Sequence, residues 1–310
     1  MTLTGRGRRG LTALCLCVSA AIAVAGCTTS RPRSSPDAAR GIVVGSFNFP
    51  ESMLLADIYA GALRAGGFRS SVEAEAGPRE IIDPALAGGI VDIVPEYTGS
   101  ALLFFGVGSV PAGSREEQSH QALADVLLAR GLIALTPAPG EDSNAIVVTE
   151  QTASRYGLHS LSDLGAVAGR LVFGGPPECP ERPLCLLGLE NVYGLRFRDF
   201  VPLDSGGPLT VQALLAGEVD VGLVFTTDPA ITAEHLVVLA DDRRLQPAEN
   251  VIPVVRRAIA ARYGPALENL IDRVSARLDT DVLRKLNRQV ASGEDPSAVA
   301  ARWLASWGKA

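Results

Sequence analysis

Residues 88–100 read Gly-Gly-Ile-Val-Asp-Ile-Val-Pro-Glu-Tyr-Thr-Gly-Ser, and this stretch decides how the rest of the chain is interpreted. The glycine pair marks a break, and Ile90 to Val94 is a short apolar run typical of a buried strand. Residues 95–100 then place an aromatic ring beside hydroxyl and carboxylate groups. Ligands of open α/β sheets bind beyond the carboxyl ends of strands, so this segment is predicted to be a binding loop.

Strand and helix patterns alternate on both sides of this stretch. The segments that read as strands are 42–45, 71–76, 132–137, 145–149, 171–173 and 219–225. The segments that read as helices are 53–65, 79–87, 114–129, 151–156, 183–191, 208–216 and most of 258–307, with Asp279 and Asp295 as first-turn caps. The alternation predicts an α/β architecture with largely parallel sheets. The 270 residues from Gly41 onward are enough for two modest domains.

Two further loops follow predicted strands and carry aromatic and polar side chains. One is Ser46 to Ser52, and the other is Thr226 to Pro229, directly after Phe225. Aromatic faces with a few hydroxyl groups suit a quaternary ammonium ligand, because its charge is attracted to the ring quadrupole. Ordinary core packing is the alternative for Phe47, Phe49 and Phe225, as is a core or lid tyrosine for Tyr97. Asp228 is also open to interpretation as a cap or an ion-pair partner.

The loop from Asp204 to Thr210 leads into a helix with proline in its first turn. Its N–H groups are candidates to hold an anionic ligand end, and a tight turn is the simpler interpretation.

The N-terminus reads as an export signal. Three arginines in the first ten residues precede an apolar run from Leu11 to Val24, which is short for a bilayer-spanning helix. The run ends in Val-Ala-Gly-Cys, which resembles a bacterial lipobox with Cys27 as the lipidated residue. An ordinary cleaved signal peptide is the alternative. We therefore expect a signal peptide over 1–26, a lipidated flexible tether over 27–40, and an extracytoplasmic protein anchored to the cell membrane by its lipid.

Charge and cysteine content agree with export. Removal of residues 1–26 takes away three arginines, which moves the formal net charge from −6 to −9 and makes nucleic acid a poor partner. Cys179 and Cys185 remain, with five residues between them in a Pro-rich loop, and are expected to form a local disulfide. A redox or metal pair is the weaker alternative, because the spacing is not C-x-x-C and no histidine is near.

The sequence carries no catalytic signature that we recognise. Its three histidines, His120, His159 and His235, are widely separated, and H-E-x-x-H and G-x-S-x-G are absent. A Gly-x-Gly-x-x-Gly match at residues 5–10 lies in the signal peptide with no strand before it. We predict no enzyme activity, no cofactor and no metal site. Because no phosphate-binding loop of the Gly-Lys-Ser/Thr type occurs, ATP hydrolysis would fall to a separate subunit.

Four stretches together resemble the substrate-binding proteins of osmoprotectant ABC importers, the glycine betaine/carnitine/choline group. They are 45–51, 88–100, 188–194 and 213–228, and Pro-Glu-Tyr-Thr-Gly is the most specific element. The resemblance implies a two-lobed type II periplasmic-binding-protein fold with two crossover strands. Lobe 1 would comprise 41–139 and 243–310, and lobe 2 would comprise 140–242.

The resemblance also implies site residues and partners. Tyr97 matches a member of the family's aromatic cage, and Ser100 and Ser52 fall where polar groups hold the other end of the ligand. Where relatives place further rings, this chain has Asn144, Phe225 and Glu249. The complete set of expected ligand-binding residues is Tyr97, Ser100, Phe47, Phe49, Ser52, Asn144, Phe225, Thr226, Asp228 and Glu249.

The expected function is capture of a small quaternary ammonium solute between the lobes and delivery to the permease subunits of an ABC importer. The alternatives are a ligand-sensing or scaffold envelope lipoprotein on the same fold, and a receptor for a different small solute.

Overall fold

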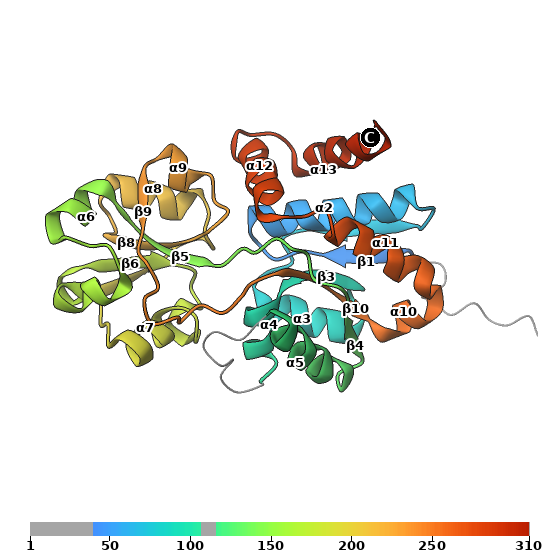
Figure 1. Ribbon diagram of the computed structural model, residues 1–310, viewed down its shortest axis with the longest axis horizontal. Helices are drawn as coiled ribbons and strands as arrows, with labels where there is room; N and C mark the ends of the chain where they lie inside the picture. The colour runs from blue at the N-terminus through green and yellow to red at the C-terminus, as the bar shows by residue number, and fades with distance from the viewer. Residues whose placement is uncertain (1–39, 107–115, 310) are drawn as a thin grey trace, which may run out of the picture. The chain divides into compact units, whose positions relative to one another are not determined.

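The computed structural model describes residues 40–106 and 116–309, which form one compact unit. Residues 1–39, which include Cys27, the expected signal peptide and nearly all of the tether, lie outside the described part. Within the described residues the chain forms two five-stranded mixed sheets, each with its own helices (Figure 1). No described helix combines the length and the apolar character that crossing a membrane would require.

The first sheet has the strand order β2-β1-β3-β10-β4. Its strands are β1 (Ile42–Gly45), β2 (Ser70–Glu73), β3 (Ile93–Tyr97), β4 (Leu132–Ala134) and β10 (Val251–Arg256). The helices in the same parts of the chain are α2 (Pro50–Ala65), α3 (Arg79–Gly88), α4 (Thr98–Phe104), α5 (Glu116–Leu128), α10 (Arg257–Tyr263), α11 (Pro265–Ser275), α12 (Thr280–Ala291) and α13 (Pro296–Ala305), followed by the 3₁₀ turn η4 (Ser306–Lys309).

The second sheet has the strand order β7-β6-β8-β5-β9. Its strands are β5 (Asn144–Thr149), β6 (Val172–Gly175), β7 (Asp199–Pro202), β8 (Val221–Phe225) and β9 (Leu236–Val238). Its helices are α6 (Glu150–Tyr156), α7 (Leu186–Tyr193), α8 (Pro208–Ala216) and α9 (Ala230–Ala233), with 3₁₀ turns η1 (Leu161–Ala166), η2 (Ala168–Arg170) and η3 (Cys179–Glu181).

Two chain segments connect the sheets: one runs from β4 to β5 and the other from β9 to β10 (Figure 1). All strands of the first sheet lie within 41–139 or 243–310, and all strands of the second lie within 140–242. The lobe boundaries given above stay a prediction.

Helix ends follow the local sequence. Helix α2 starts at Pro50, where a missing N–H costs nothing, and the chain turns away at Gly67, whose φ of +86° favours glycine. The carboxylates of Asp279 and Asp295 accept N–H bonds at the starts of α12 and α13, as predicted.

The cores follow from side-chain alternation. In β5, Ile146 and Val148 pack on one face of the second sheet, and Ala145 and Val147 pack on the other. A strand buried on both faces therefore appears in the sequence as a continuous apolar run. The first sheet and its helices share one large core that contains the fully buried Tyr59.

One sequence prediction about the sheets was wrong. The strand predicted at Ile90–Val94 is β3, Ile93–Tyr97, so Pro95 to Tyr97 are strand residues and Thr98 begins α4 rather than continuing a loop. Pro95 lies opposite Pro253 of β10, which places two residues without an N–H side by side in the ladder. The sheets are largely parallel, as predicted, and each is made mixed by one strand, β10 or β5, that runs antiparallel to its neighbours.

Candidate functional site

A cavity of about 320 Å³ brings together residues from both sheets and both connecting segments. Seven of the ten expected ligand residues line it: Phe47, Phe49, Tyr97, Ser100, Asn144, Phe225 and Glu249. They come from the loop after β1, the junction of β3 and α4, the start of the antiparallel strand β5, the end of β8, and the segment before β10. The arrangement follows the rule that binding residues gather beyond the carboxyl ends of the strands.

Phe49 is the centre of an aromatic cluster in this cavity. Its ring centroid lies 5.0 Å from that of Phe225, 5.8 Å from that of Phe47 and 5.9 Å from that of Tyr97. Phe225 ends β8, so the cluster joins residues of the two sheets. The guanidinium of Arg79 lies 4.9 Å from the centre of the Phe47 ring and already occupies one face of it.

The Tyr97 hydroxyl is bound to a buried carboxylate. It donates to Glu51 Oε1 at 2.8 Å, while Thr227 Oγ1 and Asn287 Nδ2 donate to Glu51 Oε2 at 2.7 and 2.5 Å. Burial, followed by the charge of Glu51, raises the pKa of Tyr97 well above its usual range. Thr227 follows β8 of the second sheet, whereas Glu51 lies in α2 beside the first sheet. The Glu51 carboxylate therefore connects the parts of the chain around the two sheets.

Asp142 lies in the segment between β4 and β5 and binds the other connecting segment. Its backbone N–H donates to the carbonyl of Glu249, and its Oδ1 accepts from the N–H of Thr227 at 2.9 Å. Burial and the neighbouring charge of Glu51 raise the pKa of Asp142 well above its usual range. The carboxyl group therefore keeps its proton to higher pH than an exposed aspartate.

Glu249 and Ser100 form a close pair on the cavity lining. Ser100 donates its hydroxyl to Oε1 at 2.6 Å and its N–H to Oε2 at 3.0 Å. Burial raises the pKa of Glu249 to about 7, against the opposing effects of the two Ser100 bonds and of the charge on Arg79. Arg79 itself is committed to Glu96, with contacts of 2.9 and 2.8 Å.

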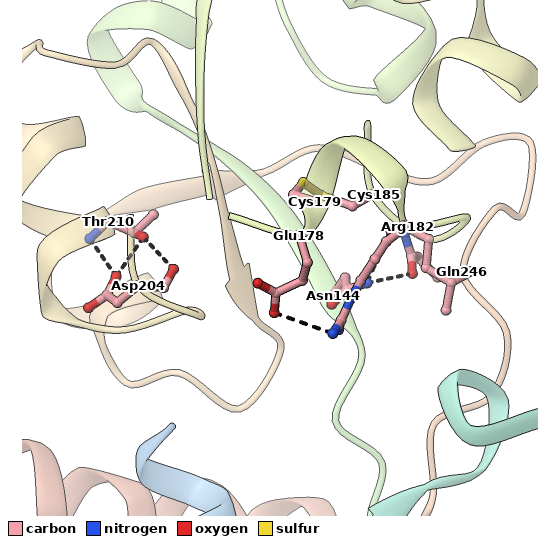
Figure 2. Close-up of a disulfide and its surroundings, with 9 residues drawn as sticks. Asn144, Glu178, Cys179, Arg182, Cys185, Asp204, Thr210 and Gln246 are labelled. Atoms are coloured by element: carbon pink, nitrogen blue, oxygen red, sulfur yellow. Dashed lines mark hydrogen bonds and ion pairs between the residues drawn. A yellow bond between two sulfur atoms is a disulfide. The ribbon is translucent and has the colours of Figure 1, made fainter. Parts of the chain in front are cut away.

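A disulfide-closed turn borders the same cavity. Cys179 and Cys185 are bonded, and Arg182 projects from the turn between them beside Glu178 (Figure 2). Arg182 forms an ion pair with Glu80 of α3 at 2.7 Å. This ion pair connects the turn, which belongs to the part of the chain around the second sheet, to a helix beside the first sheet. Asn144 donates to the carbonyl of Leu184 at 3.1 Å, so its amide supports this turn.

The other three expected residues lie elsewhere. Ser52 is fully buried, and its hydroxyl accepts the N–H of Phe47 at 2.9 Å, so it shapes the loop after β1. The Thr226 hydroxyl bonds to Ser143 and Asp142 in the connecting segment. Asp228 lines a second cavity of about 620 Å³, between α8, α9 and α12, and burial raises its pKa to about 6.

Sequence reasoning missed several residues of the first cavity and its supports. Glu51 was within a quoted loop, but nothing local indicated that its carboxylate would bond to Tyr97 across 46 residues. Arg79 and Asp142 had no motif to mark them. No group of His, Cys, Asp and Glu in the described part of the chain is arranged to hold a metal ion.

Comparisons with known proteins agree with this geometry. The family model for the substrate binding domain of the ABC-type glycine betaine transport system matches residues 40–306. The chain is 30% identical to the glycine betaine-binding protein YehZ of Escherichia coli over 277 residues, which are 86% of this chain and 90% of YehZ. It is 31% identical to a glycine-betaine-binding protein of Pseudomonas aeruginosa over 273 residues, 84% of this chain and 86% of that one.

Solved structures show the same fold. The crystal structure of a glycine betaine/carnitine/choline ABC transporter protein aligns with a TM-score of 0.65 at 23% identity, over 86% of this chain and 98% of that one. Apo YehZ aligns with a TM-score of 0.60 at 28% identity, over 87% and 99% of the two chains. The fold is thus that of the two-lobed type II periplasmic binding proteins, as the sequence predicted. The chain belongs to the family of substrate-binding domains of ABC-type glycine betaine transport systems.

Proposed function

We propose that this protein binds a small quaternary ammonium solute in the 320 Å³ cavity and delivers it to the permease subunits of an ABC importer. The observation that supports this most is the aromatic cluster of Phe49, Tyr97 and Phe225, with carboxylates beside it, in a cavity lined from both sheets. Ring faces and carboxylates both attract an organic cation.

The proposed working cycle is closure of two lobes, 41–139 with 243–310 and 140–242, around the solute. The lobes would rotate about the segments near 139–144 and 240–247. Solute binding would shift the population toward the closed form, whose composite surface the permease recognises. In this cycle the protein acts as a receptor and not as a catalyst.

Anchoring of this receptor outside the cytoplasm is part of the proposal, with Cys27 as the lipidated residue and 28–40 as a tether. Replacement of Cys27 by alanine is expected to release the protein from the membrane fraction of expressing cells. Unchanged membrane association of that variant would contradict the lipid anchor.

Calorimetric titration tests the binding function. The protein is unfolded and refolded to remove any solute that it carries, then titrated with glycine betaine, choline, carnitine and proline betaine. Saturable binding of any of these supports the proposal. A folded protein that binds none of them would contradict it.

A further inference from the structure

Two hydrogen-bond donors of the cavity, both on Ser100, are already taken by a carboxylate of the protein itself. Ser100 offers an N–H and a hydroxyl, the two donors that suit the carboxylate of a betaine. Both are directed at Glu249, at 3.0 and 2.6 Å. Glu249 is 2% exposed, so its carboxylate is a fixed part of the lining.

The two guanidinium groups on the lining are also paired. Arg79 makes a two-point contact with Glu96, and Arg182 bonds to Glu80 at 2.7 Å and lies 3.3 Å from Glu178. The charge of Arg79 favours the ionised form of Glu249, but its guanidinium hydrogen-bonds to Glu96. The Glu249 carboxylate itself accepts the N–H and the hydroxyl of Ser100.

N–H groups at the start of α8, beside the cavity, also donate to a carboxylate of the protein. Asp204 accepts the N–H groups of Leu209 and Thr210 at 2.9 Å and the Thr210 hydroxyl at 2.7 Å (Figure 2). Of the two interpretations given for the loop from 204 to 210, these bonds favour the tight turn. The Asp204 carboxylate takes two of the N–H groups that a bound anion would use.

The charges on the lining also disfavour a solute that carries a carboxylate. The lining includes the carboxyl groups of Glu80, Glu178, Glu181 and Glu249 against two guanidiniums, besides Asp142, whose raised pKa favours the neutral form. A solute carboxylate that used the Ser100 donors would have to displace Glu249 and then lie beside it, and like charges repel strongly where water is excluded. A solute that carries only positive charge meets no such penalty.

We propose that Glu249 is the specificity-determining residue of this cavity, selecting an organic monocation without a carboxylate over a zwitterion that carries the same ammonium group. This inference rests on the proposed function and narrows its substrate class. Discrimination between the two solutes arises mainly because the carboxylate of the zwitterion would lie beside the carboxylate of Glu249.

Choline and glycine betaine test this directly, because both carry a trimethylammonium group and only glycine betaine carries a carboxylate. Titration of the purified full-length protein at pH 8 is expected to give choline a dissociation constant at least about tenfold lower. In Glu249→Gln the ratio is expected to fall to within about threefold, since an amide can accept from Ser100 and also donate to a carboxylate. Glu190→Gln, which removes the same charge from an exposed pair with Arg196, keeps the wild-type ratio.

A second solute pair tests the inference without any variant. N,N-dimethylpyrrolidinium is proline betaine without its carboxylate, and it is expected to bind the wild-type protein more tightly than proline betaine. Preference for the zwitterion in both pairs, or an unchanged ratio in a folded Glu249→Gln protein, overturns the inference while the proposed function stands. Absence of binding by all four solutes contradicts the proposed function, and this inference with it.

Discussion

Tyr97 has two roles in the proposed site, because its ring faces the cavity while its hydroxyl is bonded to Glu51. The ring provides a π surface for a cation, and the hydroxyl satisfies a carboxylate oxygen that is buried with it. These roles are separable by substitution, since phenylalanine keeps the ring and alanine removes both.

Tyr97→Ala is expected to weaken choline binding by about 1–2 kcal/mol or more, the value of a desolvated cation–π contact. Tyr97→Phe should keep most of the affinity but leave Glu51 Oε1 without its donor, which lowers the free energy of unfolding by about 1–3 kcal/mol. Calorimetry and urea denaturation measure the two effects. Unchanged choline affinity in Tyr97→Ala would remove Tyr97 from the site.

Glu249 gives the cavity an expected pH dependence. Its pKa is raised to about 7, so the carboxyl group is mostly protonated below pH 7 and ionised above it. Choline keeps its charge at every pH and prefers the ionised form. Its affinity is therefore expected to rise with pH through 7, by up to about tenfold per unit below the pKa, and then to level off.

Titrations between pH 5.5 and 8.5 check this, with Glu249→Gln as the control. Asp228, whose pKa is raised to about 6, and Asp142, whose pKa is raised well above its usual range, are two further carboxyl groups in this region with raised pKa values. The variant reveals their contribution, because any pH dependence that it retains must come from groups other than Glu249. Equal pH profiles for the two proteins would contradict a role for Glu249.

The turn from Cys179 to Cys185 is held by a covalent bond and presents Arg182 to α3. It contains only one short 3₁₀ segment, and four of its five backbone N–H groups, those of Cys179, Glu181, Arg182 and Cys185, donate to nearby carbonyls. Its geometry depends on the disulfide and on the amides of Asn144 and Gln246, which both donate to the Leu184 carbonyl. The disulfide therefore helps to shape the cavity border as well as stabilising the unit.

Replacement of both cysteines by alanine is expected to lower the free energy of unfolding by about 2 kcal/mol, the chain-entropy value for a short closed loop. It should also weaken solute binding, because Arg182 is then less firmly positioned. Chemical denaturation and calorimetry measure these changes. Reduced wild-type protein is the control and should match the variant, while equal stability of oxidised wild type and variant would contradict a stabilising role.

In the region of the cavity, the parts of the chain around the two sheets are joined by polar contacts as well as by the Phe49–Phe225 ring contact. Glu51 bonds to Thr227 through its carboxylate, and Arg182 bonds to Glu80 at the cavity border. The first contact is buried and the second is partly exposed. In the proposed cycle both would break when the lobes open, so they set how long a solute is held.

Glu80→Gln is expected to raise the dissociation rate of bound choline by about two- to fivefold, because a partly exposed ion pair contributes roughly 0.5–1 kcal/mol. Stopped-flow displacement measures the rate. Glu190→Gln breaks an exposed ion pair away from the cavity and should leave the rate unchanged. Equal rates in wild type and Glu80→Gln would remove this ion pair from the closing contacts.

Much of the fold follows from patterns between near neighbours in the chain. The apolar runs at 42–45 and 221–225, the caps at Asp279 and Asp295, and the loops that follow β1 and β8 could all be predicted, because each depends on residues within a few positions. The same patterns, together with the family resemblance that supplied Asn144 and Glu249, identified seven residues that line one cavity.

The sheet directions and the partner of each polar group depended on contacts between distant segments. Local pattern ended a strand at Val94, but pairing with β10 carries β3 on to Tyr97. Glu51 meets Thr227 and Asn287 across 176 and 236 residues, and Glu249 meets Ser100 across 149. Period and propensity are local properties, whereas the partner of a buried carboxylate is whichever donor the folded chain brings within 3 Å. For that reason the sequence was enough to identify a binding protein, and folding was needed to show that Glu249 occupies the donors of Ser100.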